Sequence, residues 1–228
     1  MTMTMLHNSG VDEARDAQEA FRLLLDAITW PGKVNVLPPA ATETPASWPV
    51  ALVQVASMLL KGQRTFAVLG ENLEGLSRYL AVNTGCRPAP VHHADYVIAG
   101  HPLDWLDVWA VSASTAPASR KGAMMLLAGR FVAALDVTEQ PLAAGCKPAC
   151  VALENSKSSA VTQLDGRGIQ RQRGIMIDDD VARLLRQLAA REAERPAGID
   201  VILADGAGRI AALPNKTWRQ RGEMIWAK

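Results

Sequence analysis

Residues 199–213, Ile-Asp-Val-Ile-Leu-Ala-Asp-Gly-Ala-Gly-Arg-Ile-Ala-Ala-Leu, decide the fold class of this 228-residue chain. The apolar runs 199–203 and 209–213 predict two β-strands, and the Asp-Gly-Ala-Gly turn between them predicts a tight antiparallel hairpin. Upstream of the hairpin, candidate strands and helices alternate along the chain, which is typical of a parallel sheet covered by helices. We therefore predict one α/β domain over residues 1–228, with a mixed central sheet flanked by helices.

Hydrophobic periodicity places the other elements. The segment 11–29 carries apolar residues at helical spacing, and we expect this stripe to face the core: Ala14, Ala17, Phe21, Leu24, Leu25 and Ile28. Further helices are predicted at 49–60, 73–82, 102–111 and 178–191, the second of these with Leu73, Leu76, Tyr79 and Leu80 inward. Strands are predicted at 34–37, 65–69, 94–99, 123–128 and 161–164. The run 123–128 is apolar without alternation, as in a strand covered on both faces.

Composition excludes several classes of protein. The 24 basic and 23 acidic residues leave a net charge of +1, whereas dedicated nucleic-acid binders are usually far more basic. The first ten residues lack the pattern of a signal peptide, and no apolar run reaches the roughly 20 residues of a spanning helix. The three cysteines do not suggest a disulfide framework. We expect a cytoplasmic protein that contacts neither membrane nor nucleic acid.

The small net charge conceals an uneven distribution. Before Gly166 there are 12 basic and 15 acidic residues, and from Gly166 onward there are 12 basic and 8 acidic residues. Within the basic part, Arg167, Arg171 and Arg173 form a run that is either a solvated face or a contact for an anion or an acidic partner. Six of the eleven aromatic residues are tryptophan. Two of them share the C-terminal tail with arginines, a combination favoured at interface hot spots, and we list Trp218, Arg219, Arg221 and Trp226 as interface candidates.

The residues alone show no catalytic set. Serine is never held in a Gly-x-Ser-x-Gly turn, and Gly166-Arg167-Gly168 lacks the lysine and hydroxyl of a phosphate-binding loop. The best metal-like cluster is His92, His93, Asp95 and His101, but adjacent histidines on a strand would point to opposite faces. We predict no catalytic residues, no metal and no cofactor from the sequence.

Four stretches nevertheless resemble one protein family in the same order along the chain. The first is Asp-Ala-Gln-Glu-Ala-Phe-Arg-Leu-Leu-Leu-Asp-Ala-Ile at 16–28, followed by Pro31-Gly32. The others are Pro117 with Gly122-Ala123, Leu-Asp-Gly-Arg-Gly-Ile at 164–169, and Pro-Ala-Gly-Ile-Asp-Val-Ile-Leu at 196–203 with Leu-Pro-Asn-Lys-Thr at 213–217. Together they resemble the H subunit of the bacterial carbon–phosphorus lyase core complex. The departures include Met124 where the family has threonine, and Arg167 where it has proline.

This resemblance implies a fold similar to that of pyridoxal-phosphate-dependent transferases, without the cofactor or its lysine. It also implies a homodimer and assembly with the G, I and J subunits. The complex takes part in the synthesis of ribose 1-methylphosphonate 5-triphosphate from ATP and an alkylphosphonate, before the J subunit cleaves the carbon–phosphorus bond. The chain would be a non-catalytic or accessory subunit of that complex.

The alternative is a stand-alone enzyme or small-anion-binding protein that acts on a phosphorylated metabolite. The two hypotheses predict different surfaces. A subunit should expose a contiguous apolar patch and a self-complementary interface. A stand-alone enzyme should contain a deep pocket with convergent titratable groups.

Overall fold

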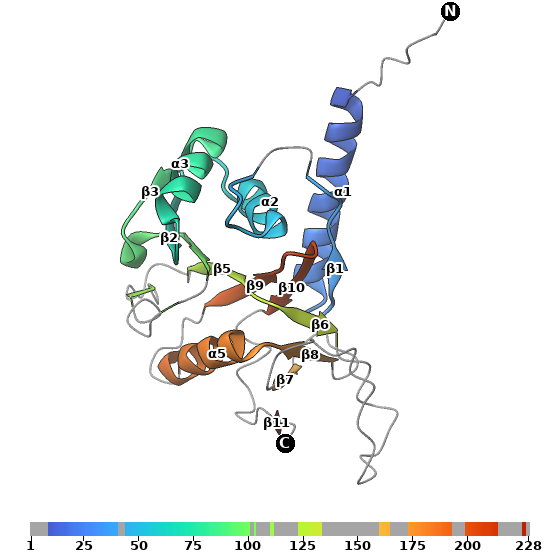
Figure 1. The fold of residues 1–228 in the computed structure, drawn as a ribbon, viewed down its shortest axis with the longest axis vertical. Coiled ribbons are helices and arrows are strands. Elements are labelled where there is room, and N and C mark those ends of the chain that lie inside the picture. The colour runs from blue at the N-terminus through green and yellow to red at the C-terminus, as the bar shows by residue number, and fades with distance from the viewer. Residues whose placement is uncertain are drawn as a thin grey trace, which may run out of the picture.

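The computed structural model describes residues 9–40, 44–100, 103, 110–111, 123–133, 160–164, 173–192, 199–213 and 225–226. A seven-stranded mixed sheet runs through the centre of these residues, in the order β1-β10-β9-β5-β4-β2-β3 (Figure 1). Its strands are β1 (Asn35–Val36), β2 (Thr65–Leu69), β3 (Arg87–Pro88), β4 (Tyr96–Ala99), β5 (Met124–Ala128), β9 (Asp200–Ala204) and β10 (Arg209–Leu213). The predicted mixed α/β sheet flanked by helices is therefore confirmed.

The hairpin that decided the fold class forms as predicted. Strands β9 and β10 pair antiparallel, with Ala204 opposite Ile210, while β9 pairs in parallel with β5 on its other side. Strands β2, β4, β5 and β9 all run parallel to one another. Their carboxyl ends consequently meet at one edge.

Alternation along each strand divides the core into two layers, because successive side chains point to opposite faces of a sheet. In β5, Met125 and Leu127 belong to one cluster of buried residues and Leu126 to the other. The strand is buried on both faces, as its unbroken apolar sequence predicts. In β9, Val201 and Leu203 likewise separate from Ile202.

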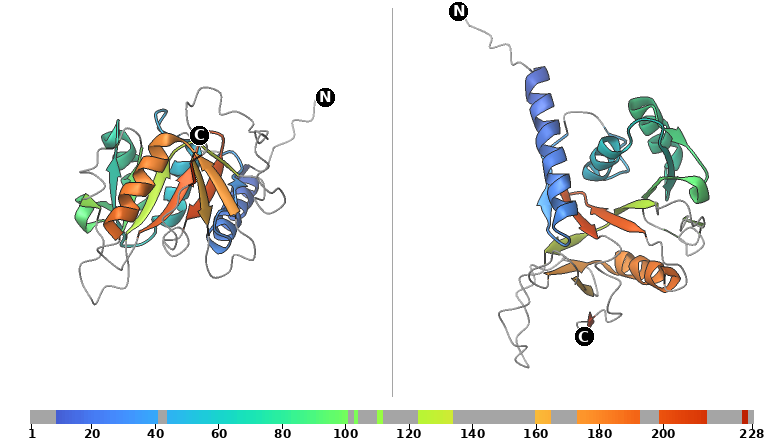
Figure 2. Two further views of the ribbon diagram at one scale, coloured as in Figure 1. Left: turned by 90° about the horizontal axis from the view of Figure 1, so that it is seen from below. Right: turned by 180° about the vertical axis from the view of Figure 1, so that it is seen from behind.

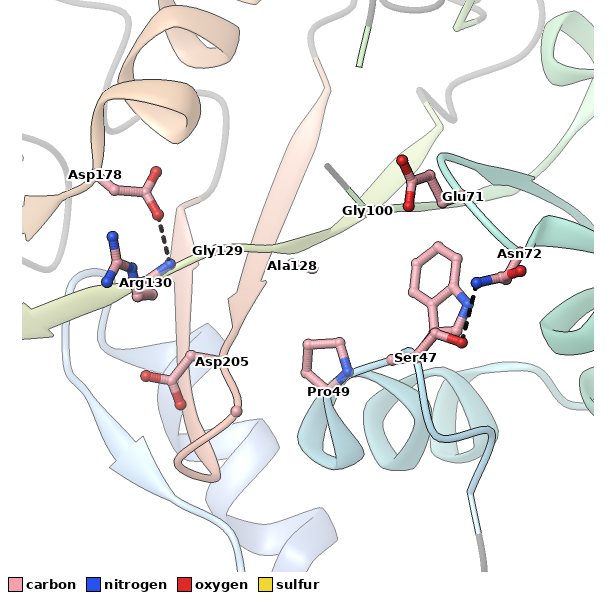
Figure 3. A pocket seen from close by; sticks show the side chains of 12 residues that line it. Ser47, Pro49, Glu71, Asn72, Gly100, Ala128, Gly129, Arg130, Asp178 and Asp205 are labelled. Carbon is pink, nitrogen blue, oxygen red and sulfur yellow. Dashed lines mark hydrogen bonds between the residues drawn. The ribbon is translucent and has the colours of Figure 1, made fainter. Parts of the chain in front are cut away.

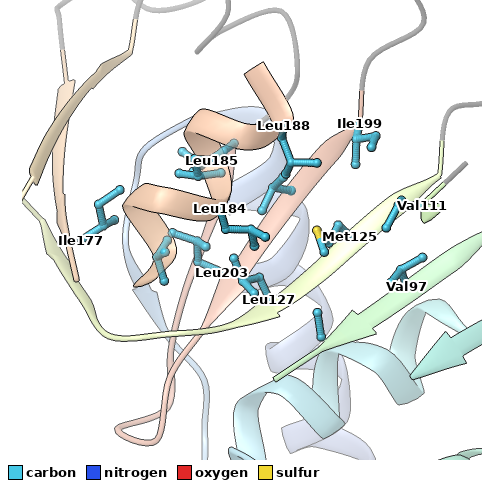
Figure 4. Packing of buried hydrophobic residues seen from close by; sticks show 14 of the residues in the cluster. Val97, Val111, Met125, Leu127, Ile177, Leu184, Leu185, Leu188, Ile199 and Leu203 are labelled. Carbon is cyan, nitrogen blue, oxygen red and sulfur yellow. The ribbon is translucent and has the colours of Figure 1, made fainter. Parts of the chain in front are cut away.

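Helices α1 (Ser9–Thr29), α2 (Val50–Leu59) and α3 (Leu73–Thr84) cover one face of the sheet, and α5 (Asp179–Glu192) covers the other (Figures 1 and 2). Leu184, Leu185 and Leu188 of α5 pack on Met125, Leu127 and Leu203 (Figure 4). Full burial of a leucine side chain contributes roughly 1.5–3 kcal/mol relative to exposure. These three leucines account for the strong amphipathic pattern of the segment 178–191.

A second sheet of four antiparallel strands lies on the α5 side, in the order β11-β7-β8-β6. Its strands are β6 (Phe131–Ala133), β7 (Ala160–Leu164), β8 (Arg173–Ile177) and β11 (Ile225–Trp226). Phe131, Ile175 and Ile177 are fully buried and join the same cluster as α5. The sequence predicted β7 but missed β8, whose first residue was assigned to the basic run.

Two predictions about packing were wrong. Ala17, Phe21 and Leu25 of α1 are exposed, the last two by 44 % and 47 %, whereas Leu24 is buried as predicted, together with Ala20 and Ala27 among the described side chains of this helix. Leu73, at the start of α3, is also exposed. In α1 the apolar stripe is wider than the face that the sheet covers, so one edge of the stripe remains on the surface.

Several short elements were missed or fall outside the described residues. Strand β3 and the 3-10 helix η1 (Val91–His93) were not predicted. Of the predicted helix 102–111, the structure describes Leu103, Ala110 and Val111. Within the described part of the chain, no helix is both long and apolar enough to cross a membrane.

Polar contacts hold α1 against the edge strand β1. The side chain of Asn35 in β1 is 7 % exposed, and its Nδ2 donates to the Leu23 carbonyl oxygen at 2.8 Å and to Asp26 Oδ2 at 2.7 Å. Lys33 Nζ lies 2.6 Å from the same Asp26 oxygen. Through these two hydrogen bonds Asn35 fixes how the helix sits against β1.

We predict that Asn35→Ala lowers the free energy of unfolding by about 1–3 kcal/mol, because it removes two hydrogen bonds between β1 and α1, one of them to a charged carboxylate. Asn83→Ala is the matched control, since Asn83 makes a similar 2.8 Å bond to the Tyr79 carbonyl on the exposed surface of α3. Urea denaturation followed by circular dichroism measures both changes. An equal loss of unfolding free energy in the two variants would contradict this role of Asn35.

Candidate functional site

An open crevice of about 360 Å³ lies at the carboxyl edge of the central sheet (Figure 3). Its walls come from the residues that follow β2, β4, β5 and β9, the segment before α2 and the residue before α5. The lining residues are Ser47, Trp48, Pro49, Glu71, Asn72, Gly100, Ala128, Gly129, Arg130, Asp178, Asp205 and Gly206. None of these positions was predicted as a site from the sequence.

The crevice adjoins the point where the sheet changes its direction of winding. Strand β3 lies on one side of β2 and β4 on the other. The connection from β2 to β3 runs through α3 on one face of the sheet, whereas Leu103 and Val111, which follow β4, belong to the cluster on the opposite face. In open α/β sheets, ligands bind outside the carboxyl ends of the strands at such a switch point.

Two glycines bring the ends of β2 and β4 close together. A Cβ atom on Gly70, which has a φ of +114°, would lie 2.8 Å from the Gly100 carbonyl oxygen. A Cβ atom on Gly100 would lie 2.8 Å from Cζ3 of Trp48 and 3.0 Å from Cη2. The absence of a side chain at Gly100 thus makes room for the Trp48 ring, which is 6 % exposed.

Helices α2 and α3 begin at the crevice. The residue before α2 is Pro49 and the residue before α3 is Asn72, and both line the crevice. In the described structure neither helix start receives a hydrogen bond from a capping side chain. The Leu52 N–H of α2 donates to the Pro49 carbonyl oxygen over 3.0 Å, whereas the first N–H groups of a helix generally have no partner within it, so both starts carry a partial positive charge.

The two aspartates of the crevice are held by hydrogen bonds. Asp178 accepts from the Val181 N–H at 2.9 Å, which caps α5, and from the Arg130 N–H at 2.8 Å (Figure 3). Asp205 is 2 % exposed and accepts from the N–H groups of Ala207 and Arg209, both at 2.9 Å. It also pairs with Nε of Arg209 at 2.5 Å. Both carboxylates therefore have structural roles, in a helix cap and in the hairpin turn.

The candidate residues from the sequence mostly lie outside the described part of the chain. This applies to Arg167, Arg171, Trp218, Arg219 and Arg221. Arg173 begins β8 and Trp226 ends β11, and for these two only the backbone is described. The predicted contacts of these residues with anions or partners stay predictions.

The histidine cluster adopts an arrangement other than the strand we considered. His92 and His93 lie in η1, with ring centroids 4.3 Å apart, while Asp95 accepts from the N–H and hydroxyl of Thr65. Among the described residues, no three histidine, cysteine or acidic side chains are placed to hold a metal ion.

A second surface feature lies away from the crevice. Phe21 and Leu25 in the C-terminal half of α1, and Trp30 just after its end, are each more than 40 % exposed, and Val36 in the edge strand β1 is 60 % exposed. We call Phe21, Leu25 and Trp30, together with the neighbouring edge strand β1, the α1–β1 face. An apolar surface of this kind, beside a sheet edge, is typical of a contact with another protein chain.

These features define a class: an α/β protein with a mixed, doubly covered sheet, an open crevice at its carboxyl edge and an exposed apolar face. A family model described as bacterial phosphonate metabolism protein (PhnH) matches residues 10–219. The chain belongs to this family and takes part in phosphonate metabolism, which confirms the family resemblance seen in the sequence. No curated protein matches the chain.

We predict that Asp178→Ala destabilises the chain by about 2 kcal/mol, because it removes both the cap of α5 and the bond to the Arg130 N–H. The control is Asp180→Ala, two residues further along the chain in α5. It removes only an exposed ion pair with Arg183 at 2.8 Å and should cost about 0.5 kcal/mol. Urea unfolding curves provide the comparison. The structural role of Asp178 is wrong if the two variants lose the same stability.

Proposed function

We propose that this chain is a non-catalytic, accessory subunit of the carbon–phosphorus lyase complex in the cytoplasm. In this proposal residues 1–228 form one domain that resembles pyridoxal-phosphate-dependent transferases but carries no cofactor. The chain associates with a second copy and with the G, I and J subunits. The family match supports the metabolic assignment, and the α1–β1 face is the observation that carries the role as a subunit.

The chemistry of the crevice supports an accessory role over a stand-alone enzyme. Both of its aspartates are engaged by backbone N–H groups, so neither is placed as a free general base. Glu71 is exposed on the crevice wall, where solvent screens the charge of its carboxylate. In this proposal the complex makes ribose 1-methylphosphonate 5-triphosphate from ATP and an alkylphosphonate, and this chain contributes binding surfaces to that reaction.

The homodimer would form through the α1–β1 face. Phe21 and Leu25 are both exposed and lie one helical turn apart on the same side of α1. In a symmetric dimer, the Phe21 ring of each copy can therefore pack against Phe21 and Leu25 of the other copy. The neighbouring strand β1 is an edge of the sheet, and its outer side is not paired with another strand of the described structure. An edge strand next to an apolar helix face suits two-fold pairing between copies.

Arg167, Arg171 and Arg173 would contact an anion or an acidic surface of a partner subunit. Trp218, Arg219, Arg221 and Trp226 would form part of a subunit interface. The support for both is compositional: the part of the chain from Gly166 onward carries an excess of basic residues, and tryptophan with arginine is favoured at interface hot spots.

Co-expression with the G, I and J subunits tests the proposed function, and Phe21→Ser with Leu25→Ser tests the surface. We expect the unaltered chain to co-purify with the other subunits and to run as a dimer by light scattering.

The double variant should be monomeric but folded, since both side chains are already exposed. Val82→Ser is the control, because Val82 is 78 % exposed on α3, away from this face. A monomeric chain that fails to join the subunits, yet turns over a phosphonate alone, would refute the proposal.

For the basic run, we expect the double variant Arg171→Ala with Arg173→Ala to weaken assembly at low salt. The difference from the unaltered chain should shrink as salt is raised, because screening already removes the electrostatic contribution. Arg183→Ala, at an exposed position of α5, is the control and should leave assembly unchanged. Unchanged affinity of the double variant at low salt would exclude a role for these arginines.

A further inference from the structure

One buried donor in the structure has no acceptor. The indole N–H of Trp48 is buried, and among the described residues no oxygen accepts a hydrogen bond from it. An indole nitrogen can only donate, so it cannot be satisfied by a neighbouring N–H. Buried polar groups are nearly always hydrogen-bonded in folded proteins, and an exception calls for an explanation. Trp48 lines the crevice, and the same crevice lies at the switch point of the sheet.

Other donors lie along the same crevice. The uncapped start of α2 follows Trp48 by two residues, and the uncapped start of α3 follows Asn72, and both Pro49 and Asn72 line the crevice. Asn72 Nδ2 donates to Ser47 Oγ over 3.2 Å, and both of these side chains are exposed (Figure 3). A bond of this length between neutral, exposed groups is easily exchanged for one to a charged acceptor.

We propose that this end of the crevice is a binding site for a phosphorus oxyanion, that is, the phosphate or phosphonate group of a small molecule. The group accepts hydrogen bonds from the indole N–H of Trp48, from the first N–H groups of α2 and α3, and from the amide of Asn72. Helix starts bind such groups because free N–H donors and the helix dipole act together. This site is independent of whether the chain assembles with partner subunits.

The charges around the crevice limit how much negative charge the ligand can carry. Asp205 is neutralised by its pair with Arg209, and Asp178 lies beside Arg130, which also lines the crevice. Glu71 remains as an exposed negative charge close to the start of α3. The surroundings therefore favour a single small oxyanion over a polyphosphate chain, which would add several negative charges beside Glu71.

Titration of the ¹⁵N-labelled full chain with methylphosphonate and with inorganic phosphate tests the site. Six indole N–H signals are expected, and the Trp48 signal is identified by its loss in Trp48→Phe. We expect this signal to shift saturably with one or both probes, and the tighter probe identifies the group that the site prefers. Sodium chloride of the same ionic strength should leave the signal in place. No shift with either probe, or an equal shift with chloride, would overturn the proposal.

Variants separate the indole from the rest of the crevice. Trp48→Phe should weaken the tighter probe at least about tenfold, since a charge-assisted hydrogen bond is lost. Trp30→Phe, the matched change on the α1–β1 face, should leave the affinity unchanged. Gly100→Ala forces the Trp48 ring to move and should also weaken binding. Should Trp48→Phe fail to fold, the shift of the Trp48 signal in the unaltered chain, assigned through the backbone, still decides the question.

The charge at Glu71 distinguishes an anion from a cation. Glu71→Gln removes a nearby negative charge, so we expect it to tighten the oxyanion by up to about fivefold. Weaker binding of the oxyanion in Glu71→Gln would show that the carboxylate supports the binding instead of opposing it, and would overturn the proposal.

Discussion

The close approach of β2 and β4 at their carboxyl ends is the constraint on which the rest of the structure depends. Gly100 carries no side chain, and Trp48 fills the space where a Cβ atom would lie. Gly70 lets the neighbouring strand turn against the Gly100 carbonyl. The ring of Trp48 in turn joins the core cluster of α1, α2 and α3. One contact therefore fixes the spacing of two strands, the position of the segment before α2 and the orientation of a buried donor.

The sequence predicts six of the seven strands of the central sheet, all but β3, because each of these six is decided by its own residues. The apolar run of β5 and the turn at Asp205 need no knowledge of distant neighbours. Tertiary context decides the rest. Phe21 and Leu25 have the same spacing and hydrophobicity as Leu24, and only the position of the sheet determines which of them is covered. Strand β8 was missed because Arg173 was assigned to a charged surface, whereas its later residues Ile175 and Ile177 are buried.

The crevice could not be predicted as a site because its chemistry lies in the backbone. Its donors are helix starts and one indole, and these carry no recognisable motif. A signal was present in the glycines that end β2, β4 and β5, namely Gly70, Gly100 and Gly129. Their shared place after parallel strands becomes visible only when the strand order is known. The arginines and tryptophans favoured by composition fall largely outside the described residues.

The two surfaces of this protein are joined by the turn of the β9–β10 hairpin. Asp205 and Gly206 in this turn line the crevice, while the Gly208 carbonyl accepts from the Leu37 N–H, next to the exposed Val36. A ligand in the crevice and a partner on the α1–β1 face would thus lie on two sides of one short turn. The turn is held by three hydrogen bonds to the Asp205 carboxylate. If the two binding events are coupled, the coupling must be reciprocal, and the turn is in contact with both surfaces.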